Sequence, residues 1–276
     1  METLTFKSAD TLSIEKLAAA FNTSFAGYFF PQHLTGETFA RRVRLEQIDL
    51  YHSLLAYEGE EFVGLSLLGI RGERGWCGGF GIVTEHRGRG RAQELMNEFM
   101  AEARRCGMKN LSLEVLARNT PARTLYERAG MKVTRDLLIL GRDLEADAPE
   151  QSTGLAEVAP ATLLRHFERL HQRTPAWQRA LPLLLTTDGA RGFCLGDVGE
   201  PRAYALLIAK PDGFTHLIDL AAGDDESASA LCAGLCKLPY TLRVVNEPED
   251  SLFVAALVKH GFGEKGRQHE MDCELF

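Results

Sequence analysis

Residues 83–96 read Val-Thr-Glu-His-Arg-Gly-Arg-Gly-Arg-Ala-Gln-Glu-Leu-Met, and this stretch decides the fold. It predicts a strand that ends at Val83, a short basic turn, and a helix that begins at once. The first N–H groups of a helix have no intrahelical acceptor and carry the positive end of the helix dipole, so they bind phosphate well. Glycines let a ligand come close to the backbone, and arginines add positive charge. The turn therefore predicts a site for a phosphorylated cofactor, with these candidate residues: Arg87, Gly88, Arg89, Gly90 and Arg91.

The turn departs from two common phosphate-binding patterns. A Walker loop ends in Gly-Lys-Ser or Gly-Lys-Thr, and a dinucleotide fingerprint has a third glycine where this chain has Gln93. The pattern that remains is Arg-x-x-Gly-x-Ala, from Arg87 to Ala92. It resembles the pyrophosphate loop of the GNAT superfamily of acyl-CoA N-acyltransferases, in which Gln or Arg, two residues, Gly, one residue, and Gly or Ala follow one another.

A second block strengthens the resemblance. It resembles the other signature of the superfamily, Leu-Glu-Val followed by Asn, Ala, Leu-Tyr and Gly-Phe, and only the final Phe is replaced, by Met131. An amphipathic helical segment, 93–106, and a short apolar strand, 111–115, separate the two blocks as the resemblance requires. The matching residues are Leu113, Glu114, Val115, Asn119, Ala122, Leu125, Tyr126 and Gly130.

The resemblance implies acetyl-CoA as the co-substrate and places it between two central strands that diverge. A backbone N–H near Ile82 is then expected to hold the oxyanion, and Ile82 and Val83 to pair with the pantetheine arm. Asn119 either donates to that arm or caps the helix that begins at Pro121, and both roles can coexist. The expected cofactor-binding set is Ile82, Val83, Arg87, Gly88, Arg89, Gly90, Arg91, Ala92 and Asn119.

Glu114 is the candidate general base. It lies twelve positions before Tyr126, near the end of a predicted central strand, where a carboxylate can take a proton from an ammonium directly or through water. In ribosomal-protein alanine acetyltransferases, a branch of the superfamily, the Leu-Glu-Val carboxylate has this role. The alternative is an ordinary strand carboxylate paired to an arginine. Weaker candidates for the base are Glu85, Glu73 and His52.

Tyr126 is the candidate general acid. The resemblance places it on the helix after the strand, with its hydroxyl directed at the sulfur of the cofactor. A free phenol has a pKa of about 10, close to that of an aliphatic thiol, so proton transfer to a thiolate needs little tuning. The alternative is a half-buried core aromatic residue with a solvated hydroxyl.

An aromatic segment near the N-terminus is a candidate acceptor pocket. In the superfamily this region commonly flanks the acceptor side of the cleft, whereas plain packing of two helices is the alternative. The sequence leaves the acceptor open as a small-molecule or peptide amine, because loop geometry has no sequence code. The segment consists of Phe25, Tyr28, Phe29, Phe30 and Pro31, followed by His33.

The order of the elements predicts an α/β (α+β) fold with two tandem GNAT-like domains, each a mixed, mostly antiparallel sheet flanked by helices. Residues 1–142 form the predicted acetyltransferase domain, 143–155 a linker, and 156–276 a degenerate second domain. In the second half, helices are expected over 161–172 and 176–185.

The second half lacks the residues expected to carry the chemistry. It has Gly223-Asp224-Asp225-Glu226 in place of the basic turn, and these carboxylates repel a diphosphate, although such a run is also an ordinary helix start. Aligning Gly261 with Gly130 places Leu257, Asp250 and Val245 opposite Tyr126, Asn119 and Glu114. The second domain is therefore expected to shape the site or to mediate assembly, for instance as a homodimer.

Charge and composition narrow the function classes. The formal net charge is −7 over 276 residues, and residues 1–142 carry +2 whereas 143–276 carry −9. An acidic protein is a poor general binder of nucleic acid, while a local basic turn still suits a polyanionic cofactor. No segment predicts a membrane span or an export signal, so a cytoplasmic location with reduced cysteines is expected. Neither the histidines nor the cysteines, Cys232 and Cys236 included, have metal-ligand spacing, so no metal is expected.

The sequence thus predicts an N-acetyltransferase that moves an acetyl group from acetyl-CoA to a primary amine by direct transfer in a ternary complex. One alternative is a non-catalytic acyl-CoA sensor or scaffold, which keeps the basic turn and dispenses with proton transfer. Another is a tandem thiol-cofactor synthase whose second unit carries the chemistry, and the acidic turn at 223–226 disfavours it.

Overall fold

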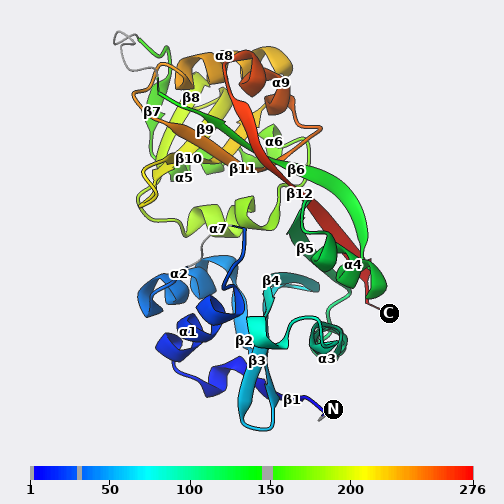
Figure 1. Cartoon of the computed structure of the whole chain (residues 1–276). Coiled ribbons are helices and arrows are strands. Elements are labelled where there is room, and N and C mark those ends of the chain that lie inside the picture. The colour runs from blue at the N-terminus through cyan, green and yellow to red at the C-terminus, as the bar shows by residue number, and fades with distance from the viewer. Residues whose placement is uncertain (1–2, 30–32, 145–151, 276) are drawn as a thin grey trace. The chain divides into compact units, whose positions relative to one another are not determined.

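The structure is a computed structural model and describes residues 3–29, 33–144 and 152–275. Both halves of the described chain contain helices and strands (Figure 1). The chain forms two compact units: unit 1 comprises residues 1–134 and 270–276, and unit 2 comprises residues 135–269.

Unit 1 is a sheet with helices on both faces, in the strand order β1-β2-β3-β4-β5-β12. Its strands are β1 (Thr5–Ser8), β2 (Ile48–Glu58), β3 (Glu61–Arg71), β4 (Arg74–Ile82), β5 (Asn110–Leu116), the start of β6 (Lys132–Arg142) and the end of β12 (Gly263–Glu274). Its helices are α1 (Ile14–Ser24), α2 (Gly36–Glu46), α3 (Arg91–Arg105) and α4 (Thr120–Arg128), with the 3-10 turns η1 (Ala9–Thr11) and η2 (Thr84–His86).

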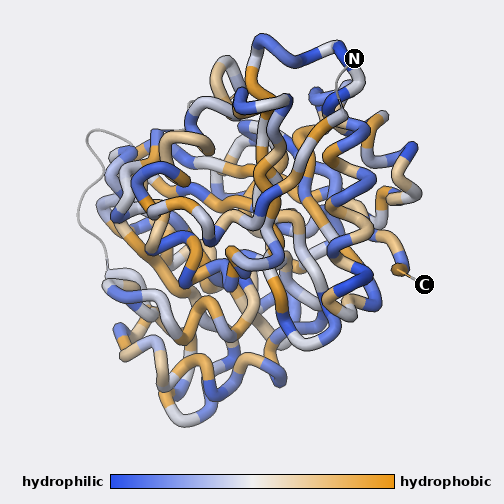
Figure 2. Tube along the Cα trace, turned by 90° about the horizontal axis from the view of Figure 1, so that it is seen from below, coloured by the Kyte–Doolittle hydropathy of each residue, from blue (hydrophilic) through white to orange (hydrophobic). Residues whose placement is uncertain are grey.

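Two apolar clusters hold unit 1 together, one on each face of the sheet. Because successive residues of a strand face opposite sides, Leu54 and Ala56 of β2 pack with α3, whereas Leu55 packs with α1 and α2. Phe99 of α3 and Phe21 of α1 are almost fully buried at the centres of these clusters. In Figure 2 hydrophobic residues (orange) and hydrophilic residues (blue) are interspersed along the trace of the chain.

The centre of the unit 1 sheet opens along one strand pair. Strands β4 and β5 are parallel, and they are paired only over Arg74–Trp76 and Asn110–Ser112. The remaining residues of each strand, Cys77–Ile82 and Leu113–Leu116, have no ladder partner across this pair among the described residues. We call this divergence the unit 1 splay. Since backbone polar groups at such an edge have no strand partner, they can bind an extended ligand.

Unit 2 repeats this plan, in the strand order β6-β11-β10-β9-β8-β7. Its further strands are β7 (Ala156–Val158), β8 (Arg191–Gly196), β9 (Pro201–Ala209), β10 (Thr215–Ala222) and β11 (Leu242–Pro248). Its helices are α5 (Pro160–Leu164), α6 (Phe167–Leu170), α7 (Leu181–Leu185), α8 (Asp225–Leu235) and α9 (Leu252–Lys259), with the 3-10 turn η3 (Trp177–Arg179). Here α8 and α9 pack on one face of the sheet, and α5 to α7 on the other.

The predicted fold class is confirmed, since both halves are mixed and mostly antiparallel sheets flanked by helices. Two helix predictions in the second half were too long. The helix expected over 161–172 is broken into α5 and α6, and the one expected over 176–185 is η3 followed by α7. Pro182 lies in the first turn of α7 and lacks the N–H that a longer helix would use, so a helix starts there more readily than it continues.

The compact units differ from the predicted domain ranges at their ends. Most of β6, from Arg135 onward, belongs to unit 2, and the last residues of β12, from Glu270 onward, belong to unit 1. The predicted linker, 143–155, lies partly outside the described residues, and its described end leads directly into β7.

Candidate functional site

The basic turn lies between the end of β4 and the start of α3, as the sequence predicted. Gly88 and Gly90 have φ values of 74° and 81°, in the left-handed region that favours glycine. Gly90 is the N-cap of α3 and has no side chain to cap the first turn, so the first N–H groups of the helix are left for another acceptor. Arg89 is exposed in this turn, and Ala92 lies in the first turn of the helix.

The other two arginines of the turn have partners within the protein. Arg91 is 3% exposed and forms ion pairs with Glu58 of β2 and Glu94 of α3. The guanidinium of Arg87 donates to the carbonyl oxygen of Ile82 at 2.8 Å and to two carbonyl oxygens at the end of α1. Arg89 thus has its charge at the surface, and Arg87 and Arg91 brace the turn through these partners. The role of the three arginines in binding a diphosphate stays a prediction.

A buried histidine completes this bracing. His86, at the start of the turn, is 4% exposed, and its ring nitrogens lie 3.4 Å from Glu58 and 3.1 Å from Glu61. Glu58 thus contacts residues on both sides of the turn, His86 before it and Arg91 after it. The carboxylate anchors both ends of the turn to the β2–β3 hairpin. Sequence reasoning missed His86 and Glu58, because only the fold brings them together.

At the end of β4, one backbone N–H is hydrogen-bonded to β3, and the N–H before it points toward the splay. Val83 donates its N–H to the carbonyl oxygen of Val63 on the β3 side at 2.9 Å, so that N–H does not serve a cofactor. Because N–H groups alternate in direction along a strand, the N–H of Ile82 faces the opposite edge, toward β5. The N–H of Val83 thus faces β3 and that of Ile82 faces the splay, and the pairing of these two residues with a pantetheine arm stays a prediction.

Glu114 lies on β5, two residues beyond the last residue that pairs with β4. Its Oε2 accepts a hydrogen bond of 2.8 Å from the indole N–H of Trp76, which is buried on β4. This neutral donor fixes the direction of the carboxylate. Cys77 is the next residue of β4, and burial raises the pKa of its thiol to about 12.

Tyr126 lies on α4, and its side chain is 7% exposed. Its ring meets that of Phe80 on β4 edge to face, with centroids 6.1 Å apart. Burial raises the pKa of Tyr126 well above its ordinary value. The phenol is therefore protonated throughout the physiological range, as a proton donor must be. Glu114 and Tyr126 both contact β4 within the stretch from Trp76 to Phe80, along the open edge of the splay.

Asn119 is the N-cap of α4, and its side-chain oxygen accepts from the N–H of Ala122 at 3.4 Å. The capping role that the sequence offered is therefore present. Asn119 also hydrogen-bonds Tyr28, whose pKa is raised by burial and lowered in part by that bond. The guanidinium of Arg118 stacks on the ring of Phe29 at 4.6 Å. The segment after α1 thus covers the β5–α4 turn.

Of the other residues of the aromatic segment, some pack in the core and some are exposed. The ring of Phe25 stacks on that of Phe21 at 4.3 Å, which is core packing. Phe30 and Pro31 lie outside the described residues. Phe29 is 45% exposed, and His33 follows it as an exposed residue.

The weaker candidates for the base lie elsewhere. Glu73 forms an ion pair of 2.7 Å with Lys109 at the closed end of the β4–β5 pair. His52 bonds Glu102 of α3 at 2.6 Å. Glu85 is exposed in η2. Of the candidates, Glu114 alone lies on either of the two strands that form the splay.

Unit 2 has a splay of its own but no basic turn. Strands β10 and β11 are parallel and paired only over Thr215–Leu217 and Leu242–Val244. The side chain of Asp224 caps α8 by accepting from the N–H of Ser227 at 2.7 Å, and Asp225 and Glu226 lie in the first turn. A carboxylate of the protein thus already occupies the helix terminus, as the acidic run predicted.

Two further findings concern metals and membranes. Within the described ranges, no group of three or more His, Cys, Asp or Glu residues has an arrangement that could hold a metal ion. Among the same residues, no helix is both long enough and apolar enough to cross a membrane.

The fold and the turn define a class of protein. Residues 18–131 match the family model described as the acetyltransferase (GNAT) family, so this part of the chain contains a GNAT family-model domain. The whole chain has the fold of tandem GNAT proteins. It covers 99% of a tandem GNAT protein from the clavulanic acid biosynthesis pathway, with 99% of this chain aligned, at 13% identity and a TM-score of 0.71.

Further relatives agree with this assignment. A GCN5-related N-acetyltransferase from Sphaerobacter thermophilus aligns with 99% of this chain and 96% of its own, at 15% identity and a TM-score of 0.70. At such identities the likeness concerns the fold alone. An uncharacterized N-acetyltransferase of Bacillus subtilis, YycN, is 40% identical over 55 residues, 20% of this chain. The chain thus matches 35% of the length of this curated relative.

Proposed function

We propose that the chain is an N-acetyltransferase that moves an acetyl group from acetyl-CoA to a primary amine within unit 1. The observation that carries the proposal is the joining of two features on β4: the strand diverges from β5, and it runs directly into a glycine turn at an uncapped helix terminus. An open strand edge suits the amide groups of a pantetheine arm, and the turn suits its diphosphate.

The residues that remain for the diphosphate are the backbone of the turn and one side chain. The N–H groups from Gly88 to Ala92 provide hydrogen-bond donors, and Arg89 provides an exposed positive charge. Arg87 and Arg91 hold the turn in shape through their internal partners. In this proposal the arginines that flank Arg89 are positioning residues.

Glu114 is the proposed base. A neutral amine is needed for attack on a thioester, so the carboxylate takes the ammonium proton directly or through a water molecule. The hydrogen bond from Trp76 to Oε2 holds the carboxylate on β5 beside the divergence from β4. The N–H of Ile82, on the facing strand, is the proposed donor to the oxyanion.

Tyr126 is the proposed acid. It gives its phenolic proton to the sulfur as the C–S bond breaks, which leaves a thiol and a phenolate, and the phenolate regains a proton from the nitrogen of the new amide. Its raised pKa keeps the phenol protonated until the C–S bond breaks. We expect direct transfer in a ternary complex and no acyl-enzyme on a cysteine. Cys77 lies beside Trp76 on β4, and its raised pKa makes it a poor nucleophile.

The acceptor is proposed to enter beside the segment after α1. Tyr28 and Phe29 contact Asn119 and Arg118 at the β5–α4 turn, so they border the same end of β5 as Glu114. This segment offers aromatic faces, and the neighbouring turn offers one arginine, to an acceptor. Small-molecule amines and peptide N-termini are both acceptors of the proposed class.

Release of CoA thiol from acetyl-CoA in the presence of a panel of amines tests the proposal. The expected result is amine-dependent release that Glu114→Gln and Tyr126→Phe reduce, while both variants bind CoA as the wild type does. Binding of CoA with no release for any amine would instead support the non-catalytic sensor. Failure to bind CoA would overturn both functions.

A further inference from the structure

A cavity of about 150 Å³ lies in unit 2 where its two central strands diverge. The ends of β10 and β11 line it, together with the start of α9 and the segment that joins α6 to η3. Drug-sized ligands fill pockets of about 300–1,000 Å³, so an occupant of this cavity is a smaller molecule. The acidic first turn of α8 also excludes a diphosphate from this splay.

Three of the side chains at this place are charged and almost fully buried: Arg179, Asp219 and Glu247 are 6%, 0% and 2% exposed. Arg179 forms an ion pair with Glu247 and lies 3.9 Å from Asp219. Buried ion pairs contribute little to stability compared with apolar side chains of the same volume. Their concentration beside a cavity is typical of a functional site.

His171 is a further polar neighbour of this group. Its Nδ1 lies 3.0 Å from the carbonyl oxygen of Phe167, and its Nε2 lies 3.0 Å from Asp219. The charged side chains that line the cavity are two arginines and two carboxylates, Arg173, Arg179, Glu247 and Asp250, so positive and negative charges are equal in number.

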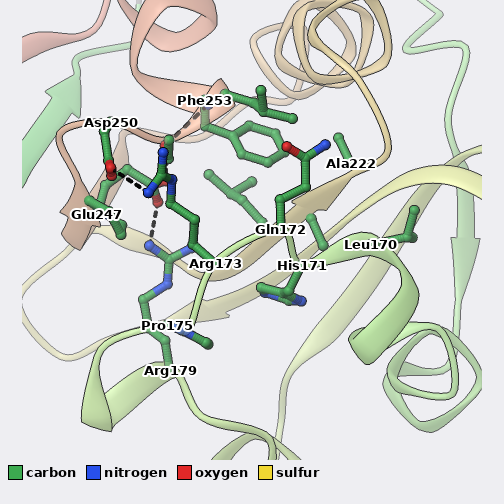
Figure 3. A pocket seen from close by; sticks show the side chains of 15 residues that line it. Leu170, His171, Gln172, Arg173, Pro175, Arg179, Ala222, Glu247, Asp250 and Phe253 are labelled. Carbon is green, nitrogen blue, oxygen red and sulfur yellow. Dashed lines mark hydrogen bonds and ion pairs between the residues drawn. The ribbon is translucent and has the colours of Figure 1, made fainter.

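The rim of the cavity is neutral and bipolar too. Arg173 and Asp250 form an ion pair of 2.7 Å and are both more than half exposed. Figure 3 shows Arg173 and Arg179 reaching toward Asp250 and Glu247, with the ring of Phe253 beside them. The guanidinium of Arg179 also keeps a donor, its Nε, that has no partner among the described residues.

The strand edge contributes a backbone donor. Gly223 donates its N–H to the carbonyl oxygen of Arg202 on the β9 side at 3.1 Å. Because the direction alternates, the N–H of Ala222 faces the opposite edge, where the cavity lies. This place in unit 2 corresponds to that of Ile82 in unit 1.

We propose that this cavity binds a small zwitterion of the α-amino acid type. The cationic groups, Arg173 and Arg179, receive its carboxylate, and Glu247 and Asp250 receive its ammonium. Leu170 and Phe253 provide an apolar wall for its side chain. A lining that is neutral and bipolar favours a ligand that is also neutral and bipolar, because an ion of one sign would leave an unpaired charge in a desolvated site. This inference is independent of the proposed function of unit 1.

Isothermal titration of the full chain with glycine, L-alanine and L-leucine tests the proposal, with acetate and methylamine as probes that carry one charge each. At least one amino acid is expected to bind at least about tenfold more tightly than acetate or methylamine. Arg173→Gln and Asp250→Asn are each expected to weaken that binding by about tenfold, and both residues are exposed enough for the variants to fold.

A matched control is the exposed pair of Arg123 and Glu127 in unit 1, with a distance of 2.8 Å and similar exposure. Arg123→Gln and Glu127→Gln are expected to bind the amino acid as the wild type does. The absence of binding by all three amino acids at millimolar concentration would overturn the proposal. So would equal binding of acetate or methylamine, which would show an ion site, or unchanged binding in both rim variants.

Discussion

The two splays of this chain have the same construction and opposite chemistry. Each follows a short parallel pairing, and each has a bulge on its first strand, at Gly78 in β4 and at Ile218 in β10. Seven residues, 84–90, then separate Val83 from α3, whereas Asp224 alone separates Gly223 from α8. In unit 1 the result is an open helix terminus with an exposed arginine, and in unit 2 it is a terminus capped by a carboxylate.

The two splays also differ in the side chains that lie along their first strands. Unit 1 has Gly78, Gly79 and Gly81 along β4, where side chains pack closely on the strand, and its candidate groups, Glu114 and Tyr126, contact β4 at Trp76 and Phe80. Unit 2 has the buried Asp219 on β10, held by His171 and by the hydroxyl of Tyr204 at 2.8 Å. The comparison teaches that ligand chemistry depends on the loop and on a few side chains, while the sheet provides only the opening.

The largest effect is expected at Tyr126. Tyr126→Phe removes the proposed proton donor and keeps the ring against Phe80, so kcat is expected to fall by about 100-fold with an unchanged Kd for CoA. Steady-state kinetics and titration calorimetry measure the two constants. Since burial raises the pKa of Tyr126, loss of its proton is not expected to lower kcat of the wild type below about pH 10. An unchanged kcat in the variant would remove the acid role.

Two variants at Gly90 test whether an acidic N-cap residue, as found in unit 2, weakens CoA binding in unit 1. Gly90→Asp places a carboxylate at the N-cap of α3, as Asp224 does for α8, and Gly90→Asn is the neutral control of equal size. A Cβ at Gly90 meets nothing within 4 Å, and the strain of a positive φ is shared by both variants. The aspartate is expected to weaken CoA binding at least about tenfold more than the asparagine, and added salt is expected to reduce that difference.

Equal CoA affinity in the two Gly90 variants at low salt would contradict an anion site at this terminus. The measurement is the Kd for CoA by calorimetry at two ionic strengths. Melting temperatures of both variants establish that unit 1 is folded in each.

Two arginines of the turn are expected to have different roles: Arg89 contributes to CoA binding, and Arg91 contributes to stability. Arg89→Ala removes an exposed charge, so it weakens CoA binding several-fold and leaves Tm unchanged. Arg91→Ala leaves Glu58 and Glu94 without their buried partner, so it lowers Tm. Calorimetry and thermal melting of the two variants check this division. The reverse pattern, with a normal Tm for Arg91→Ala, would show that Arg91 is a ligand-binding residue.

The smallest effect is expected at Asp224. A backbone hydrogen bond from Ser227 lowers the pKa of Asp224, so its charged form adds stability above about pH 4 that is lost as the pH falls through the lowered pKa. Asp224→Asn keeps a capping oxygen, and its Tm is expected to approach that of the wild type as the pH falls from 7 to 3. The variant is not expected to gain a second CoA site, because the seven-residue loop is missing; a second equivalent bound would contradict this.

The sequence predicted those features that depend on local chemistry. The turn at Gly88 and Gly90, the start of α3 and the capping of α4 by Asn119 all follow from neighbouring residues. The tandem repeat followed from the order of the elements. These are properties that a chain carries within a dozen residues.

The features that were missed depend on contacts between distant residues. Arg91 was assigned to a diphosphate, and its partner Glu58 lies 33 residues earlier on another strand. Trp76 was not connected with Glu114, although they bond across the β4–β5 pair. The charged group at the cavity of unit 2 joins residues from the segment after α6, from β10 and from β11. Such partners are fixed only when the sheet forms, so spacing along the chain does not predict them.

The central claim is that the turn ahead of α3 in unit 1, and no place in unit 2, holds the diphosphate of CoA. The most direct test is a crystal structure of the full chain with CoA, combined with the stoichiometry from calorimetry. The expected result is one CoA per chain, with its phosphates on the N–H groups between Gly88 and Ala92. A diphosphate bound in unit 2, or a Gly90→Asp variant that binds CoA as tightly as the wild type, would contradict the account.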